Sequence, residues 1–242
     1  MKEYGSRDIA ERQFYDSSWD KWTEMKQFGP MSRHVRRLSL GILKRLNFRS
    51  VLDAGCGEGS FLSALQIVKP GLSLSGVDIS EVAVTHARKL LPGAKFYVAD
   101  LEKEIIEKTF DLVTAIDVIE HIPDDITFLH NIRRMTDKYF LVCTLIGRMR
   151  PFEKSVGHVR NYTEKELIEK LSASDFRVVL VKKWGLPFYS PLYRNILQYV
   201  PESAYTGRFS FSKKVTSQLL YYLFKFNFSN RGDVIFILAE TV

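Results

Sequence analysis

Cysteine is scarce in this chain of 242 residues, and long apolar runs are missing from it. The two cysteines, Cys56 and Cys143, cannot form a disulfide framework, which favours a reducing, cytoplasmic setting. Neither has metal-ligand spacing with the other or with the five histidines, so we expect no metal site. We also expect no membrane span, because no run is apolar over the width of a bilayer, and no signal peptide, because residues 1–22 carry charges throughout.

The composition is otherwise that of a folded globular protein. An apolar fraction of 45% and a charged fraction of 26% argue against disorder, and the length suits one α/β domain, with or without an elaboration. The net charge of +7 is a regional property. Residues 182–231 hold eight lysines and arginines against one acid, Glu202, so the remaining sequence is nearly neutral.

Short apolar runs alternate with helical patterns from residue 50 onward. Strands are expected at 50–54, 72–79, 94–100, 110–117, 138–145, 176–184 and 233–241. Helices are expected at about 60–68, 81–91, 124–135 and 163–174. This alternation predicts βαβ units and a doubly wound, Rossmann-like parallel sheet covered on both faces.

Two segments fall outside the alternation. Residues 1–47 have a helical pattern, and 184–231 is too long and too apolar for a linker, with thirteen aromatic residues between Trp184 and Phe228. We interpret 184–231 as an aromatic and basic cap with short helices, inserted between the sixth and seventh strands. It could be a cap with its own small core, a lid over an apolar or aromatic acceptor, or a basic surface for RNA or an anionic membrane.

The stretch "VLDAGCGEGSFL" predicts a strand that turns into a helix around a ligand. Its glycines Gly55, Gly57 and Gly59 follow the pattern G-x-G-x-G rather than the G-x-G-x-x-G of dinucleotide sites. Asp53 precedes them, and its carboxylate would repel a pyrophosphate but would suit a cationic amine. The loop therefore favours a nucleoside with an amino-acid tail over NAD.

Two more acids follow predicted strands. Asp78 ends the second strand, where a carboxylate can accept hydrogen bonds from both ribose hydroxyls, and Asp100 ends the third, where it could accept from an adenine amine. Open α/β sheets bind ligands at the carboxyl ends of their strands, so the three acids are expected to meet.

Together these motifs resemble the class I S-adenosylmethionine-dependent methyltransferases, in particular the small-molecule branch that includes ubiquinone-biosynthesis O-methyltransferases. The resemblance covers roughly 10–183 and 232–242, and it rests on the glycine loop, "GVD" at 76–78, "ADL" at 99–101, and "FDLV" at 110–113 with "VIEHI" at 118–122. It implies a single domain over 1–242 with a mainly parallel seven-stranded sheet whose last strand is antiparallel, a helical lid at 1–47, and S-adenosylmethionine as cofactor, converted to S-adenosylhomocysteine. The cofactor-binding residues it implies are Arg33, with Arg36 and Arg37 as rivals, and Asp53, Gly55, Cys56, Gly57, Gly59, Asp78, Ile79, Asp100, Leu101 and Ile116.

The resemblance implies direct transfer of the sulfonium methyl group, with Glu120, His121 and His158 as candidate catalytic residues where a base is needed. We expect a small-molecule acceptor, apolar or lipid-linked, methylated on oxygen rather than nitrogen or carbon. An RNA methyltransferase and a cofactor-binding protein without catalysis are the alternatives, and nucleic acid is not the expected partner. The cap could make peripheral contact with a membrane, and both a monomer and a homodimer remain open.

Overall fold

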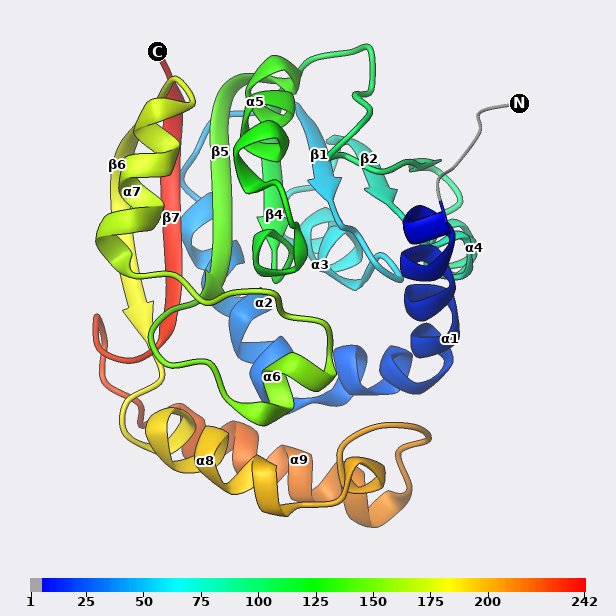
Figure 1. Ribbon diagram of the computed structural model, residues 1–242, viewed down its shortest axis with the longest axis vertical. Coiled ribbons are helices and arrows are strands. Elements are labelled where there is room, and N and C mark those ends of the chain that lie inside the picture. The colour runs from blue at the N-terminus through cyan, green and yellow to red at the C-terminus, as the bar shows by residue number, and fades with distance from the viewer. Residues whose placement is uncertain (1–5) are drawn as a thin grey trace.

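A seven-stranded sheet forms the centre of the computed structural model, which describes residues 6–242 (Figure 1). Residues 1–5 of the N-terminal segment lie outside the described part. The strands are β1 (Ser50–Ala54), β2 (Ser73–Asp78), β3 (Lys95–Val98), β4 (Phe110–Ile116), β5 (Thr136–Leu145), β6 (Phe176–Trp184) and β7 (Val234–Thr241). Their order across the sheet is β3-β2-β1-β4-β5-β7-β6, in which β7 alone runs antiparallel to its neighbours. The predicted sheet, with its antiparallel last strand, is confirmed.

Helices cover both faces of this sheet. On one face, Phe128 of α5 (Asp125–Met135) and Leu167 of α7 (Glu164–Ala173) pack against the strands. On the other, Leu62 of α3 (Ser60–Val68) and Val84 of α4 (Glu81–Leu90) do the same. Because both faces are buried, the central strands β4, β5 and β7 contain buried apolar runs rather than an alternating pattern.

Local signals set the helix ends as the sequence indicates. Thr163 begins α7 by accepting a hydrogen bond from the amide of Glu166 at 3.1 Å, and the Glu166 carboxylate accepts in return from the Thr163 amide at 3.5 Å. This reciprocal pair satisfies two backbone donors that the first helical turn leaves unpaired. Between β5 and α7, residues 146–163 contain one short helix, α6 (Pro151–Ser155).

The N-terminal segment consists of two helices, α1 (Ser6–Phe28) and α2 (Pro30–Leu43), with a break at Gly29 and Pro30. In Figure 1, α1 runs along the right side of the molecule beside α4, α2 passes diagonally from the lower part of the molecule to behind the sheet, and the cap forms the lowest layer. The cap contains α8 (Arg194–Ile196) and α9 (Phe211–Phe224), and four short helical turns complete the fold: η1 (Ile119–His121), η2 (Phe188–Tyr193), η3 (Leu197–Tyr199) and η4 (Glu202–Ala204). Among residues 6–242, no helix is both long enough and apolar enough to cross a membrane.

The cap does not have a core of its own. Trp184, Tyr189 and Phe224 are buried in one cluster with Val35 of α2 and with the ends of β5 and β7. The imidazole of His34, also from α2, stacks between Trp184 and Tyr221 at centroid distances of 4.8 and 4.4 Å. The alternative of an independent cap core is therefore wrong, because the aromatic side chains attach the cap to α2 and to the sheet.

Candidate functional site

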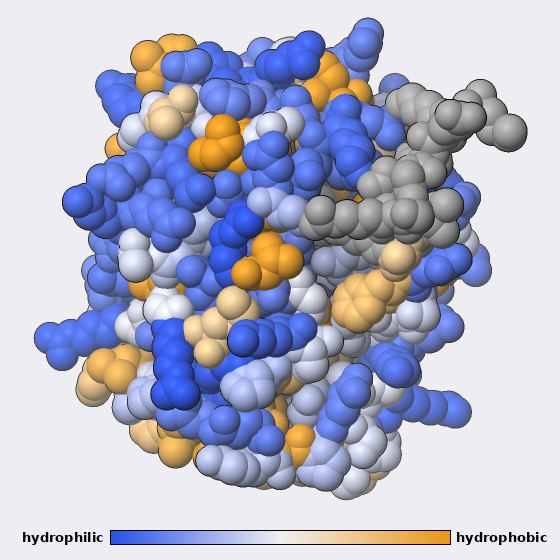
Figure 2. All heavy atoms as spheres, viewed as in Figure 1, coloured by the Kyte–Doolittle hydropathy of each residue, from blue (hydrophilic) through white to orange (hydrophobic). Residues whose placement is uncertain are grey.

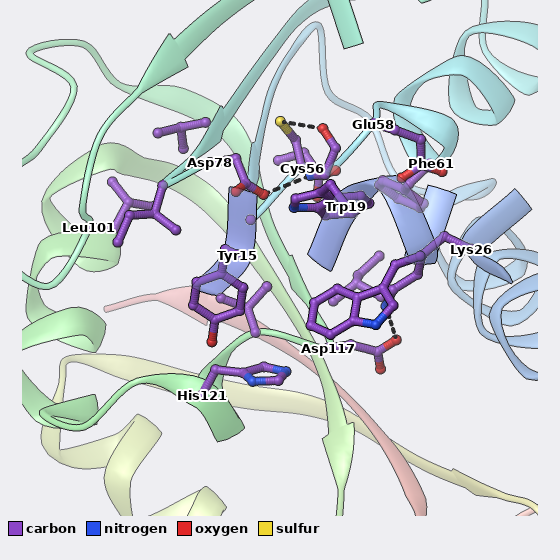
Figure 3. A pocket seen from close by; sticks show the side chains of 18 of the residues that line it. Tyr15, Trp19, Lys26, Cys56, Glu58, Phe61, Asp78, Leu101, Asp117 and His121 are labelled. Atoms are coloured by element: carbon purple, nitrogen blue, oxygen red, sulfur yellow. Dashed lines mark hydrogen bonds and ion pairs between the residues drawn. The ribbon is translucent and has the colours of Figure 1, made fainter. Parts of the chain in front are cut away.

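The carboxyl ends of β1, β2, β3 and β4 surround a cavity of about 180 Å³, which we call the edge pocket. Its walls combine strand-end acids, the glycine loop and side chains from the N-terminal helices, seen in Figure 3. Of the predicted cofactor residues, the following line it: Asp53, Gly55, Cys56, Gly57, Asp78, Ile79, Asp100, Leu101 and Ile116. Gly59 lies just behind, as the residue that caps α3.

The glycine loop needs glycine for two separate reasons. Gly55 and Gly57 have φ angles of +73° and +52°, a region that L side chains rarely adopt. A Cβ at Gly57 would also lie 2.3 Å from the ring of Trp19, and one at Gly55 would lie 2.3 Å from Val118. The loop is therefore closely packed under α1, which brings Trp19 over the site.

Asp78 holds the loop in place. Its Oδ2 accepts from the Gly57 amide and its Oδ1 from the Ser80 amide, both at 2.9 Å. Burial raises the pKa of Asp78 to about 6 despite these bonds. A carboxylate has about four acceptor positions, so a ligand hydroxyl can still bind.

Asp53 is also buried, on β1 beneath the loop. Its Oδ1 accepts from the hydroxyl of Thr114 at 2.6 Å, and burial raises its pKa to about 7. A cationic ligand group would give the ionised Asp53 carboxylate a partner of opposite charge and so stabilise it. That environment agrees with the amine proposed from the sequence.

Asp100 differs from the other two acids, because it makes its contacts at the surface of its turn. It accepts from the Glu102 amide at 3.0 Å and pairs with Lys103 at 3.0 Å. These contacts fix the turn after β3, which places the buried side chain of Leu101 in the pocket wall.

Arg33 does not reach the edge pocket. It donates to Gln218 at 2.9 Å, and its guanidinium lies 3.9 Å from the ring centre of Tyr221, so it attaches α2 to α9. Arg36, one helical turn later, lines the pocket instead. The prediction that Arg33 lies at the cofactor site is therefore wrong for this pocket, and its rival Arg36 stands in the pocket wall.

Glu58 is a pocket residue that the sequence analysis missed. It lies in the glycine loop, its side chain is buried, and its Oε1 has no hydrogen-bond partner among the described residues. Glu58 and Arg36 give this end of the pocket one acidic and one basic side chain, which suits the ammonium and the carboxylate of an amino acid. The signal was in the sequence, as an acid between two loop glycines.

A second, larger cavity of about 600 Å³ adjoins the edge pocket, and we call it the cap cavity. Its walls come from the cap, from α6 and from the start of α2, and they are mainly apolar, with Tyr189, Leu197, Phe209 and Leu220 among them. The two cavities share Trp22, Lys26, Ser32, Asp117 and His121. A group bound in one can thus face a group bound in the other.

Lys26 and Asp117 form an ion pair at this junction, with Nζ and Oδ2 3.3 Å apart (Figure 3). Burial alone would lower the pKa of Lys26, but Asp117, Glu58 and Glu120 more than offset it and raise the pKa. Asp117 has a φ of +56°, and its amide donates to the Cys143 carbonyl at 2.9 Å. Its position after a strand could have indicated a role, whereas nothing in the sequence around Lys26 did.

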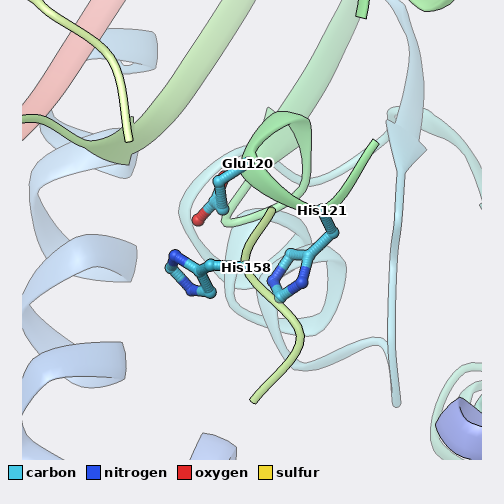
Figure 4. A group of neighbouring side chains, drawn as sticks. All are labelled: Glu120, His121 and His158. Atoms are coloured by element: carbon cyan, nitrogen blue, oxygen red, sulfur yellow. The ribbon is translucent and has the colours of Figure 1, made fainter. Parts of the chain in front are cut away.

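Glu120, His121 and His158 are brought together although 38 residues separate the first from the last (Figure 4). The Val159 amide donates to the Glu120 carbonyl at 2.9 Å, which places His158 beside His121 with their ring centres 4.7 Å apart. All three line the cap cavity, and His121 lines the edge pocket as well.

Glu120 differs from the two histidines in the direction of its pKa shift. Burial, and next Asp117, raise the pKa of Glu120 to about 8, and Thr144 donates to its Oε2 at 2.8 Å. Burial lowers the pKa of His121 to about 3 and also lowers that of His158. At neutral pH the imidazoles are therefore neutral acceptors, while Glu120 is mostly protonated.

The same three residues have the donor types of a metal site, with ligand atoms within 4.8 Å of one another. However, metal binding requires an ionised carboxylate, and the ammonium of Lys26 opposes a further cation at this position. The protonation states of these residues therefore do not suit a metal ion, and we assign none.

Comparison with known proteins indicates a methyltransferase, in agreement with the resemblance seen in the sequence. Residues 52–139 match the family described as Methyltransferase domain. The ubiquinone biosynthesis O-methyltransferase of Aliivibrio fischeri is 29% identical over 139 residues, which is 53% of this chain and 58% of that protein. The trans-aconitate 2-methyltransferase of Escherichia coli is 32% identical over 78 residues, 32% of this chain and 31% of that one. The chain thus spans about half the length or less of these relatives.

The fold is also found in solved structures. The magnesium protoporphyrin IX methyltransferase of Synechocystis, crystallised with S-adenosylmethionine, superposes with a TM-score of 0.63 at 17% identity and full coverage of both chains. At that identity the likeness concerns the fold.

Proposed function

Since the chain carries a methyltransferase domain of the class I family, we propose that it transfers a methyl group from S-adenosylmethionine to a small apolar molecule. The observation that carries this proposal is the junction of the two cavities at Lys26, Asp117 and His121. The edge pocket would hold the cofactor and the cap cavity the acceptor. Oxygen is the proposed methylated atom, ahead of nitrogen and carbon, and the O-methyltransferase among the relatives supports it.

In this proposal the cofactor extends along the strand ends. Its methionine part would lie on the glycine loop, with the carboxylate at Arg36 and the ammonium near Asp53 and Glu58. Asp78 would bind the ribose, and Asp100 and the Leu101 amide the adenine. Ile79 and Ile116 would pack against its apolar parts, since both line the pocket.

The chemistry is a displacement at the sulfonium methyl. A lone pair of the acceptor oxygen forms the new C–O bond, the C–S bond breaks with its electron pair moving to sulfur, and S-adenosylhomocysteine remains. Because the sulfonium is already activated, the protein mainly has to align the two reactants, and such alignment is worth roughly 7–11 kcal/mol.

The hydroxyl proton needs an acceptor. His121 touches both cavities, and this position makes it the proposed base, with His158 adjacent to receive or orient the proton. Because burial lowers the pKa of His121 to about 3, it is a weak base, and the proposal relies mainly on the activated sulfonium and on alignment. Glu120, mostly protonated, is better suited to fixing the turn that carries His121, through Thr144 and the Val159 amide.

Incubation of the protein with methyl-labelled S-adenosylmethionine and an organic extract of cells tests this proposal. We expect label in an apolar small molecule and none with the variant Asp78→Ala. Label in RNA would favour the RNA methyltransferase. The observation behind that alternative is the positive charge of residues 182–231, which could bind phosphates. Cofactor binding by calorimetry without transfer to any pool would favour the non-catalytic alternative.

Further parts of the proposal concern the whole chain. We treat 1–242 as one domain in which the helices of 1–47 and the cap at 184–231 close the site. Both cysteines are buried and unpaired in the described chain, which supports a reducing, cytoplasmic setting. Monomer and homodimer remain alternatives that sedimentation would separate.

A further inference from the structure

An apolar stripe faces outward from α9. Phe211, Val215, Leu219 and Tyr222 recur at the spacing of one helix face, and Phe226 follows just after the helix ends. Phe211 is 85% exposed, Leu219 66% and Phe226 72%. These five residues, the outward stripe, are the reverse of what a surface helix normally presents, since large apolar side chains that gather in the open mark a contact surface.

The opposite face of α9 belongs to the proposed acceptor site. Ser217 and Leu220 line the cap cavity, and the Ser217 hydroxyl bonds to the carbonyl of Phe28. Phe224 is fully buried in the cluster with Trp184. One helix therefore separates the cap cavity from the surface that carries the outward stripe.

Basic side chains accompany the stripe. Lys214 and Lys225 are exposed on and just after α9, and Arg208 and Arg231 are exposed nearby in the cap sequence. The cap segment contains a single acid, Glu202. An apolar stripe with basic neighbours is the composition of helices that lie in the interface of an anionic bilayer, where the apolar groups enter the acyl region and the lysines meet the headgroups.

The charge and the apolar side chains of this surface favour an anionic bilayer over a second copy of the chain or RNA. A second copy of the chain would bring the same basic residues against themselves. RNA bases stack on aromatic rings but would leave Val215 and Leu219 without an apolar partner. Apolar residues also lie among hydrophilic ones at the end of the molecule formed by the cap (Figure 2).

We propose that the outward stripe of α9 docks the protein on the surface of an anionic lipid bilayer. The cap cavity then lies directly behind the docked helix, so an apolar acceptor can enter it from the lipid. This last step rests on the proposed function, whereas docking itself does not.

Flotation with lipid vesicles tests the docking. The probes are vesicles of phosphatidylcholine alone and of phosphatidylcholine with phosphatidylglycerol. We expect the protein to float with the second kind and to be released as salt rises. The triple variant Phe211→Ser, Leu219→Ser and Phe226→Ser should bind at least about tenfold more weakly, and the pair Lys214→Glu and Lys225→Glu should remove the preference for anionic lipid.

The matched control is Ile67→Ser, since Ile67 is 81% exposed on α3, away from the cap, and should leave vesicle binding unchanged. Equal binding of the triple variant and the wild type, or no vesicle binding by the wild type, would overturn the proposal. So would a loss of dimer mass in the triple variant without vesicle binding, which would assign the stripe to a second copy. Calorimetric affinity for S-adenosylmethionine should stay the same throughout, so failure of docking is distinguished from failure of the proposed function.

Discussion

The edge pocket and the cap cavity meet at Lys26 and His121, but the chain builds them differently. The edge pocket uses short loops that each follow a strand, so its acids lie a few residues from a rigid sheet. The cap cavity is assembled from α1, α2, α6 and a long insertion, and buried aromatic and charged contacts hold these parts together. Local backbone geometry therefore places the acids and glycines of the edge pocket. Its cover by α1 and α2, and the whole of the cap cavity, depend on contacts between segments that are distant in the sequence.

This difference suits the division of work that we propose. The cofactor is the same in every reaction of this kind, and loops whose conformation depends on glycines and a few acids would bind it. An acceptor is matched by a cap whose lining can change without disturbing the sheet. Variants should therefore affect the two cavities separately, and the following predictions test that separation.

The largest effect is expected at the attachment of the cap. The side chain of Arg194, in the cap, is buried. Its Nε donates to Glu153 at 2.9 Å, and its Nη1 donates to Asp233 at 2.6 Å. Arg194→Met removes the nearer of two cations from these carboxylates and leaves them only Arg150, at 3.9 Å from Glu153 and 3.6 Å from Asp233. The free energy of unfolding should therefore fall by about 3 kcal/mol in urea titrations. The exposed pair Arg177–Glu240 is the control, and Arg177→Met should cost about 1 kcal/mol at most. Equal losses in the two variants would contradict a charge-based attachment of the cap.

The next effect concerns the glycine loop. Gly57→Ala places a Cβ 2.3 Å from Trp19 at a φ of +52°, so affinity for S-adenosylmethionine should drop by more than about tenfold in calorimetry. Gly71→Ala is the control, because Gly71 has a φ of +86° but open space around it. The double variant Gly57→Ala, Trp19→Ala should regain part of the affinity. No rescue would show that backbone strain, rather than Trp19, sets the cost.

At the junction we expect an effect on turnover rather than on cofactor binding. Lys26→Met removes the partner of Asp117, and kcat/KM should fall about 10- to 100-fold while the Kd for S-adenosylmethionine changes much less. Lys26→Arg should retain most of the rate. Lys138→Met, in the ion pair with Asp111 at the other edge of the sheet, should change neither. A parallel loss of cofactor affinity in Lys26→Met would assign Lys26 to the edge pocket alone.

The smallest effect is a pH dependence of cofactor affinity. The pKa values of Asp53 and Asp78 are raised to about 7 and about 6, and the ligand amine and ribose favour the ionised forms. Affinity should therefore rise by about tenfold between about pH 5.5 and 7.5, with proton release in calorimetry. The stability of the unliganded protein should move the opposite way. Because both carboxyls hold protons that the unfolded chain has lost, its free energy of unfolding decreases as pH rises from about 4 to 7, and Asp53→Asn should flatten that slope.

Much of the edge pocket could be predicted from the sequence because its residues follow strands directly. Asp53, Asp78 and Asp100 were located by the rule that parallel strands end at a common edge, and all three line the pocket. Arg33 was misplaced because a helix offers Arg33, Arg36 and Arg37 on different faces, and only packing decides which one turns inward. Here Tyr221 and Gln218 hold Arg33 on the side of α9.

The sequence by itself determined the sheet, its order of elements and the chemistry of the glycine loop, since periodicity, turn residues and strand ends act over short distances. Only the tertiary structure decided that Lys26, Asp117 and His121 share a junction, that His158 lies beside His121, and that α9 turns five apolar side chains outward. The physical reason is that these features arise from packing among α1, α2 and the cap. Such packing joins residues that are 187 positions apart and leaves no period in the sequence.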